Sequence, residues 1–419
     1  EPAIRISVCE ILLSKYEKSS SEYSLLTSRL ASMFISGTGE YERGVDLLPF
    51  LEEAAEMNYS PSTIQAEVYL TTGDIYTSMG LPYRAFKSYE RAIDISKALV
   101  GDSNTFRNHR ELSLSYNCFG DVHLALNKPY EALKYFQYAL EIREKLIAER
   151  DTLQNQHELA RCLNRLGDVH RDLGQPYNSM RYYERSLKIR EALLAEVQTF
   201  RNQEMLTYSL DRMGDIYWES GQPYKALTYY QRSLKVREII LAEFETFQYK
   251  RIFTYALSRI GGVYQDLGEP YKALTYFQTF YETMAGLEHS SPSPHNRLGL
   301  MIAINRVGDV HRDLGQLLKA LGQFKKSLNV IRALLEESDA PQHKRLFTFT
   351  LMRFGDVHRD LSQPYKALEY FNRALEISEA LLDESDTPRN QRELTFCLNR
   401  VGDVHRDLSQ PYKALEYFN

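Results

Sequence analysis

The tripeptide His-Arg-Asp is the most chemically suggestive motif in this 419-residue sequence, where it occurs four times. In protein kinases the aspartate of this tripeptide is the catalytic base, and an asparagine follows it five residues later. Here the residue five positions after Asp172 is Tyr177, and no glycine-rich loop or Asp-Phe-Gly motif accompanies it. Because the four copies recur at one phase of a repeat, they indicate a repeated structural element. We expect no enzymatic activity within residues 1–419.

Histidines recur three residues after a repeated glycine, at His123, His170, His311, His358 and His405. A metal site needs ligands that converge within about 2 Å of one ion. Equivalent positions in stacked helical repeats lie about 10 Å apart, and tyrosine occupies the same position in other repeats. We therefore predict that these histidines pack as tyrosine replacements, and we expect no metal, no cofactor and no nucleophilic centre.

Glycine recurs at an interval of 47 residues without one insertion or deletion. The positions are Gly73, Gly120, Gly167, Gly214, Gly261, Gly308, Gly355 and Gly402. Self-similarity at such a period is typical of a solenoid. Apolar residues at helical spacing on both sides of a Gly-x-Pro break predict two helices per repeat. Gly221 is expected to end a first helix in the left-handed conformation, and Pro223 to lie in the first turn of a second helix.

Each repeated glycine is followed 12 residues later by a small side chain and, four residues further on, by an aromatic one. For Gly355 these residues are Ala367 and Phe371. A glycine in mid-helix costs roughly 1 kcal/mol relative to alanine, so its recurrence predicts a close crossing of two helices. We expect the small residue to face the glycine and the aromatic ring to fill the flank. The predicted fold is all-α, a solenoid of stacked helical hairpins.

This pattern of glycine, small residue and aromatic resembles the tetratricopeptide repeat (TPR), and Leu166 and Tyr217 fit the same pattern beside their glycines. The resemblance covers about residues 20 to 419. It implies an α-α superhelix whose first helices line a concave face that binds a protein or peptide. The 47-residue period exceeds the family's roughly 34 residues, which implies longer helices, and the proline that closes a typical TPR repeat is absent.

The two ends of the chain differ from the regular array. Residues 1–57 are predicted to form an N-terminal capping helix and a degenerate repeat. Residues 58–419 are predicted to form eight repeats, of which the last is truncated. Because the sequence starts at Glu1 and stops at Asn419 inside an expected helix, we interpret it as part of a longer protein.

A polar stripe on the predicted first helices is the candidate partner-binding surface. Positions three before and one, four and five after the glycine share one helical face, which the TPR resemblance implies to be concave. The candidate residues are Asn164, Asp168, Arg171, Asp172, Asp211, Asp215, Trp218, Glu219, Asn305, Asp309, Arg312, Asp313, Asp356, Arg359, Asp360, Asn399, Asp403, Arg406 and Asp407.

Two interpretations of this stripe stay open. Asp and Arg three residues apart can pair along a helix, worth only about 0.2–0.5 kcal/mol, which would leave a solvated, self-paired face. Alternatively the stripe holds an extended peptide or a partner's surface, with Trp218 as an anchor. Replacing Asp168, Asp309 and Asp403 together by alanine would then weaken partner capture with little effect on thermal stability. The frequent aspartate after the glycine favours a mixed or basic ligand.

The composition excludes several classes of partner. Charges of both signs are interspersed and the net charge is -5, which argues against binding to nucleic acid or to an anionic membrane. No apolar stretch is long enough to span a bilayer, and no signal peptide opens the chain. The four cysteines Cys9, Cys118, Cys162 and Cys397 are scattered, which indicates buried thiols in a reducing compartment. We therefore predict a cytoplasmic protein.

The first functional prediction is a protein-interaction scaffold that binds a partner along its concave face as a subunit of a larger complex. The alternative rests on a second resemblance. The long-helix array is similar to that of bacterial TPR-CHAT proteins, in which a caspase-like protease follows the repeats. The resemblance implies control by a partner such as an RNA-guided CRISPR effector complex. No catalytic His/Cys pair lies within residues 1–419, so this alternative makes the array a sensor.

Overall fold

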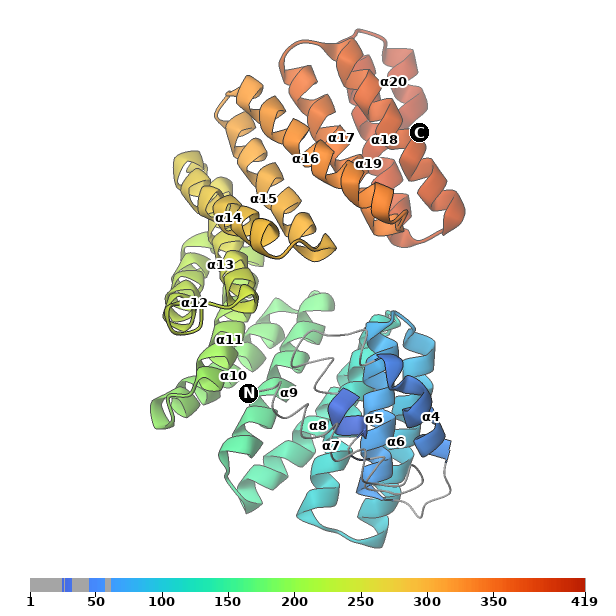
Figure 1. Ribbon diagram of the computed structural model, residues 1–419, viewed down its shortest axis with the longest axis vertical. Helices are drawn as coiled ribbons and strands as arrows, with labels where there is room; N and C mark the ends of the chain where they lie inside the picture. Colours follow the sequence, from blue (N-terminus) through green and yellow to red (C-terminus); the bar gives the residue numbers. More distant parts are fainter. Residues whose placement is uncertain (1–24, 26, 32–44, 57–61, 419) are drawn as a thin grey trace. The chain divides into compact units, whose positions relative to one another are not determined.

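A computed structural model describes residues 25, 27–31, 45–56 and 62–418 (Figure 1). All regular secondary structure in these ranges is helical, which confirms the all-α prediction. The helix expected before residue 20 lies outside the described residues, so the domain boundary at residue 57 stays a prediction. The first labelled helices are α4 (Leu48–Glu56), α5 (Thr63–Ser78) and α6 (Pro82–Asp102).

From α7 onward the helices repeat one plan. A first helix of 20 residues and a second of 21, each followed by a three-residue connection, account for the 47-residue period. The first helices are α7 (Phe106–Ala125), α9 (Leu153–Asp172), α11 (Phe200–Glu219), α13 (Phe247–Asp266), α15 (Pro294–Asp313), α17 (Pro341–Asp360) and α19 (Pro388–Asp407). The second helices are α8 (Pro129–Glu149), α10 (Pro176–Glu196), α12 (Pro223–Glu243), α14 (Pro270–Ser290), α16 (Leu317–Glu337), α18 (Pro364–Glu384) and α20 (Pro411–Phe418).

The turn inside each hairpin has one left-handed residue, which is glycine in five described hairpins and Asn127, Ser362 or Ser409 in three others. Gly174 has a φ of 68°, and its N–H donates to the carbonyl oxygen of Arg171 at 2.9 Å. The N–H of Gln175 donates to the carbonyl oxygen of His170 at 2.8 Å. These two bonds form a Schellman motif, which a left-handed residue makes possible. Gly221 has a φ of 70°, as predicted from the sequence.

Hydrogen bonds at the start of α19 tie this helix to the hairpin before it. The hydroxyl of Thr387 accepts a hydrogen bond from the N–H of Asn390 at 3.2 Å, which caps α19. The side chain of Asn390 then donates to the carbonyl oxygens of Leu381 at 2.8 Å and Ser385 at 2.9 Å. Hydrogen bonds from the side chain of Asn390 therefore join the start of α19 to the end of α18.

The repeated glycines contact aromatic rings, which corrects the expectation that the small side chains face them. A Cβ added to Gly355 would lie 2.6 Å from Cδ1 of Phe371, a ring that is fully buried. The same contact joins Gly73 to Tyr89, Gly120 to Phe136, Gly167 to Tyr183, Gly261 to Phe277, Gly308 to Phe324 and Gly402 to Phe418. Because protein interiors are close-packed, the ring fills the space that the missing side chain leaves, and a single methyl group has no room there.

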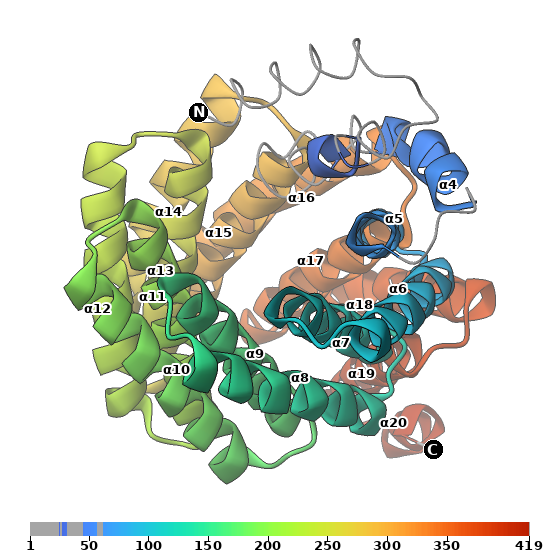
Figure 2. The ribbon, with the colours of Figure 1, turned by 90° about the horizontal axis from the view of Figure 1, so that it is seen from below.

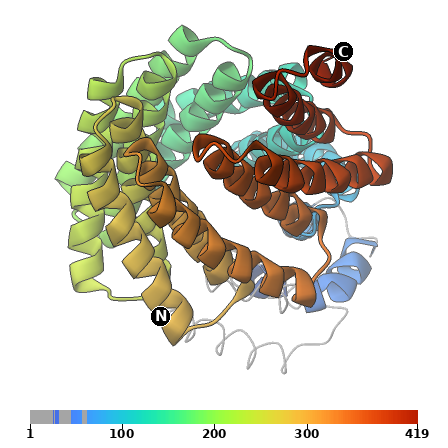
Figure 3. The ribbon, with the colours of Figure 1, turned by 90° about the horizontal axis from the view of Figure 1, so that it is seen from above.

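The chain divides into two compact units, unit 1 (Glu1–Ile216) and unit 2 (Tyr217–Asn419). In unit 1, α5 contacts α7, and the first helices lie on the inner side of the stack while α8 and α10 lie on its outer side (Figure 2). In unit 2 the hairpins stack side by side (Figure 3), and α15 contacts α17. We call the surface that the first helices form the first-helix face. It consists of α5, α7 and α9 in unit 1 and of α13, α15, α17 and α19 in unit 2.

The three described cysteines are unpaired. Burial raises the pKa of the Cys162 thiol to about 12 and raises the pKa of Cys397. Thiols of this kind are unreactive because the thiolate is the nucleophile. Cys9 lies outside the described residues. Within the described ranges, no helix combines the length and the apolar character needed to cross a membrane.

Candidate functional site

The residues of the polar stripe differ widely in exposure. The buried members are Asn164, Asp168, Asp211, Asp215, Asn305 and Asp356. The half-buried members are Arg171, Trp218, Asp309, Arg312, Arg359 and Asp403. The exposed members are Asp172, Glu219, Asp313, Asp360, Asn399, Arg406 and Asp407. The stripe therefore consists of a buried part that faces other repeats and an exposed part that a partner can reach.

In four repeats the aspartate after the glycine pairs with an arginine of the next repeat, 44 residues later. Arg353 donates from Nε to Oδ1 of Asp309 at 2.8 Å and from Nη2 to Oδ2 at 3.0 Å. Equivalent pairs are Arg165–Asp121, Arg212–Asp168 and Arg400–Asp356. These arginines were not among the site residues predicted from the sequence. Their recurrence two residues before the glycine in six consecutive repeats is the signal that could have found them.

A second set of pairs starts from the arginine four residues after the glycine. Arg312 contacts Oδ2 of Asp356 at 3.2 Å and Oδ2 of Asp360 at 2.5 Å, both in the next repeat. Arg359 makes the same two contacts with Asp403 and Asp407. Pairing along one helix, as between Arg406 and Asp403 at 2.7 Å, accompanies these contacts. The stripe is therefore a ladder of ion pairs that runs between repeats.

Asp168 shows how the ladder contributes to stability. Its carboxylate accepts a hydrogen bond from the hydroxyl of Tyr183 at 2.6 Å and lies 3.0 Å from Nε of Arg212. Burial, followed by the charge of Asp168, raises the pKa of Tyr183 and keeps this hydroxyl protonated. Loss of the carboxylate would leave two buried donors without an acceptor. For Asp168 the structure therefore replaces the expectation of unchanged thermal stability with an expected loss.

Unit 2 replaces one ion pair of the ladder by an aromatic contact. Trp218 occupies the position of the forward-reaching arginine, and Gly262 the position of its aspartate. Nε1 of Trp218 donates to Oδ2 of Asp266 at 2.7 Å, as Arg312 does to Asp360. A Cβ on Gly262 would lie 2.7 Å from Cη2 of the indole. The indole N–H of the predicted anchor therefore has a partner within the chain.

This exchange makes a testable prediction. We expect Gly262→Asp to lower the free energy of unfolding by roughly 1–3 kcal/mol, because the new side chain overlaps the indole ring. Trp218→Arg combined with Gly262→Asp recreates the usual ion pair and should recover most of the loss in urea denaturation. Gly286→Asp is the control, because a Cβ at that helical glycine meets no atom within 4 Å. A double variant as unstable as Gly262→Asp alone would contradict the assignment.

The glycine at position 262 also deprives Arg306 of a carboxylate. Arg306 follows Gly262 by 44 residues, the separation that joins Arg353 to Asp309. Among the described residues no carboxylate lies within ion-pairing distance of Arg306, whose guanidinium carbon instead lies 6.0 Å from the centre of the Phe277 ring. Arg306 is exposed. On the first-helix face of unit 2, Arg306 thus forms no ion pair, although the carboxylates of Asp309 and Asp266 act on it at longer range.

Arg306 lines a cavity of about 180 Å³ between α15 and α17. Its other lining residues are Met301, Ile302, Asn305, Leu346, Phe349 and Arg353. The amide oxygen of Asn305 is buried and has no hydrogen-bond partner among the described residues, a condition that costs about 1–3 kcal/mol unless something binds the oxygen. The cavity therefore combines apolar walls, a cation and an unsatisfied acceptor.

The repeated histidines stack on tyrosines of the following helix. The ring centres of His170 and Tyr182 are 5.3 Å apart at an interplanar angle of 11°, and His358 stacks on Tyr370 at 5.4 Å and 5°. Tyr217 makes the same stack with Tyr229, so histidine and tyrosine are interchangeable there, as predicted. Within the described ranges, no group of three His, Cys, Asp or Glu side chains is placed to hold a metal ion.

Models of the tetratricopeptide repeat match four segments of the chain. One model matches residues 111–192 and a second matches residues 66–99, 208–239 and 350–381. The longest match covers two consecutive repeats in unit 1, and the others are spread over both units. None of the curated proteins matches the chain in sequence.

Several solved structures are similar to the chain. A signal transduction ATPase with numerous domains from Pyrococcus horikoshii, which carries a tetratricopeptide repeat sensor, is 17% identical with a TM-score of 0.50; the match covers 80% of this chain and 49% of that one. The quorum sensor NprR from B. thuringiensis is 14% identical over 95% of this chain and 85% of its own, with a TM-score of 0.49. Aspartyl phosphate phosphatase F from Bacillus subtilis is 15% identical over 96% and 93%, with a TM-score of 0.49. At these identities the similarity shows the helical-repeat fold alone.

Proposed function

Since this chain carries tetratricopeptide repeats, we propose that it is a non-enzymatic scaffold that binds a protein or peptide on its first-helix face. One observation carries the proposal. Arg306 stands on that face without a carboxylate, beside a cavity with apolar walls and an unsatisfied amide oxygen. A partner segment would supply a carboxylate to Arg306.

The size and the charge of the surface define the proposed segment further. An apolar cavity of about 150 Å³ holds one benzene molecule, so a cavity of about 180 Å³ holds one phenylalanine or leucine side chain. Asp313 is exposed on the same face of unit 2 and accepts a hydrogen bond from the uncharged side chain of Gln265, so its charge favours a basic residue beside it. The proposed ligand is therefore an extended segment of mixed charge with an apolar residue next to an acidic one.

Selection from a peptide-display library on the purified chain tests this proposal. We expect the selected peptides to pair an apolar residue with Asp or Glu, and we expect Arg306→Gln to weaken their binding about tenfold, which corresponds to about 1.4 kcal/mol. Arg251→Gln is the matched control, because Arg251 is an exposed arginine on α13 that does not line the cavity. Peptides that bind both variants equally well would contradict the site.

The sensor alternative requires an effector beyond Asn419. It predicts that the gene continues into a domain with a separated His and Cys pair, and that peptide binding to the first-helix face changes the activity of that domain. Extending the sequence past Asn419 distinguishes this alternative from a plain scaffold. The predicted cytoplasmic location and membership of a larger complex are part of the same proposal, and cell fractionation followed by size-exclusion chromatography tests them.

A further inference from the structure

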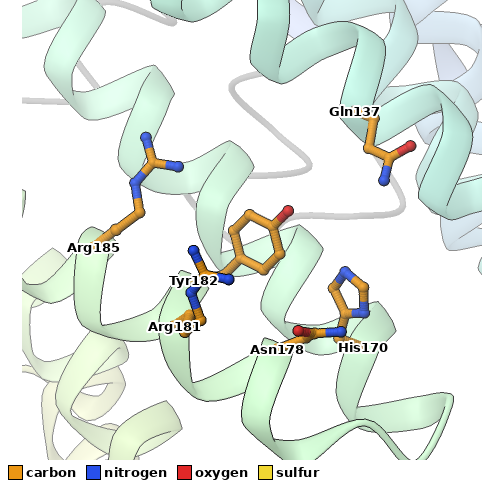
Figure 4. A pocket seen from close by; sticks show the side chains of 6 residues that line it. All are labelled: Gln137, His170, Asn178, Arg181, Tyr182 and Arg185. Carbon is orange, nitrogen blue, oxygen red and sulfur yellow. The ribbon is translucent and has the colours of Figure 1, made fainter.

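A polar cavity of about 200 Å³ lies where α8, α9 and α10 of unit 1 meet (Figure 4). It opens between two second helices, so it is separate from the first-helix face. Its lining residues are Gln137, His170, Asn178, Arg181, Tyr182 and Arg185. Figure 4 shows the two arginines on one side of the Tyr182 ring and His170 and Gln137 on the other.

The lining of the cavity carries positive charge, although the net charge of the whole chain is negative. Two of its six lining side chains are guanidinium groups and none is a carboxylate, whereas the net charge of the chain is -5. Arg181 and Arg185 are four residues apart on α10 and therefore share one helical face. Arg181 is exposed and has no ion-pair or hydrogen-bond partner in the described part of the chain. Nη2 of Arg185 donates to Glu144 at 2.7 Å, which leaves most of its five N–H groups available.

Contacts within the cavity hold its uncharged groups in place. Nδ1 of His170 lies 2.7 Å from Oε1 of Gln175, an oxygen that also accepts a hydrogen bond from Asn178 at 3.3 Å. The His170 ring stacks on Tyr182, which fixes the plane of the tyrosine. The hydroxyl of Tyr182 has no hydrogen-bond partner among the described residues. A hydroxyl group without a partner thus belongs to the lining of the same cavity as the two guanidinium groups.

The cavity between α8 and α10 differs from its neighbour in having no carboxylate in its lining, although the two earlier repeats also carry a cation, Lys87 or Lys134, at the position of Arg181. The equivalent cavity one repeat earlier, between α6 and α8, has a volume of about 190 Å³ and is lined by Glu90 and Asp94 in addition to Lys97. At the position of Arg181, later repeats carry Thr228, Thr275, Gly322 and Glu369. The coincidence of two arginines on one helical face therefore distinguishes the cavity between α8 and α10.

We propose that this cavity binds the phosphate group of a phosphate monoester. Such a group carries about -1.5 to -2 charges at pH 7 and three strong acceptor oxygens, which match two guanidinium forks and the hydroxyl of Tyr182. A carboxylate has only two oxygens and one charge, and a phosphodiester has one charge, so either leaves donors unpaired. The volume of about 200 Å³ also leaves room for the group that the phosphate esterifies.

Calorimetric titration of the purified chain tests this proposal with defined probes. We expect O-phosphoserine and O-phosphotyrosine to bind at least about tenfold more tightly than glutamate, a difference of about 1.4 kcal/mol. Inorganic phosphate that binds as tightly as the esters would support the same site with free phosphate as its ligand. The proposal is overturned if no phosphate compound binds more tightly than glutamate, or if single-stranded oligonucleotides bind more tightly than both esters.

Three variants locate the binding. Arg181→Gln should weaken phosphoserine binding about tenfold, and it should leave folding intact because the side chain is exposed and unpaired. Glu144→Gln should tighten binding severalfold, because it releases Arg185. Arg91→Gln is the matched control, since Arg91 holds the position of Arg185 on α6 and is also exposed. Equal affinities in Arg181→Gln and the unmodified chain, or an equal loss in Arg91→Gln, would overturn the assignment.

Discussion

Gly355→Ala is expected to lower the free energy of unfolding by about 1–3 kcal/mol, although alanine favours a helix over glycine by roughly 1 kcal/mol. The reason is steric. The new Cβ would lie 2.6 Å from Cδ1 of Phe371, a ring that is fully buried and therefore cannot move aside. Urea denaturation followed by circular dichroism measures the loss, and the larger Gly355→Leu should cost at least as much.

A second glycine of unit 2 supplies the control for this experiment. Gly322 lies inside α16, and a Cβ built on it meets no atom within 4 Å. Gly322→Ala should therefore stabilise the chain by about 0.5–1 kcal/mol. Opposite signs for the two substitutions would show that the ring contact outweighs helix propensity at Gly355. If both substitutions stabilised the chain, the proposed role of the repeated glycine would be wrong.

Asp168→Ala is expected to cost about 2 kcal/mol or more, because it removes the acceptor of two buried charge-assisted bonds at once. Tyr183 loses its partner at 2.6 Å, and Arg212 loses the carboxylate at 3.0 Å. The bond to Tyr183 joins α9 to α10 within one hairpin, and the contact with Arg212 joins α9 to α11 of the next repeat, so both packings should loosen. Thermal and urea denaturation measure the effect.

Asp172 provides the matched control, because it lies one helical turn from Asp168 on α9 and is exposed. Asp172→Ala should change the free energy of unfolding by no more than about 0.5 kcal/mol. Arg212→Gln should cost nearly as much as Asp168→Ala, and the double variant less than the sum, since the partners share one interaction. Equal effects of Asp168→Ala and Asp172→Ala would show that the ladder adds nothing to stability.

Two departures from the repeat pattern, at Trp218 and Gly262, are linked in unit 2. The loss of the carboxylate at Gly262 is accommodated by Trp218, whose ring occupies the space that an aspartate would need. The same loss leaves Arg306 without its acceptor, on the face proposed to bind a partner. The loss of the carboxylate at position 262 is therefore compensated sterically by Trp218, whereas Arg306 has no ion-pair partner in its place. The proposed ligand site therefore coincides with a position where the repeat pattern is broken.

The sequence alone determined the number and the type of the structural elements. A glycine every 47 residues, together with Gly-x-Pro breaks, defined hairpins of two long helices. Their ends agree with the structure because these signals are local: a left-handed residue such as Gly221 and a proline such as Pro223 act within one turn of chain. The polar stripe could also be placed on one helical face, since helical spacing alone assigns it.

Only the tertiary structure decided what those residues contact. The sequence suggested that Asp309 pairs along its own helix, whereas its partner is Arg353 in the next repeat. It placed a small side chain against Gly355, whereas the ring of Phe371 lies there. It did not show that Arg181, Arg185 and His170 surround one cavity. These contacts join residues 11 to 44 positions apart, and they depend on how the helices pack within and between hairpins, which no local preference of the chain specifies.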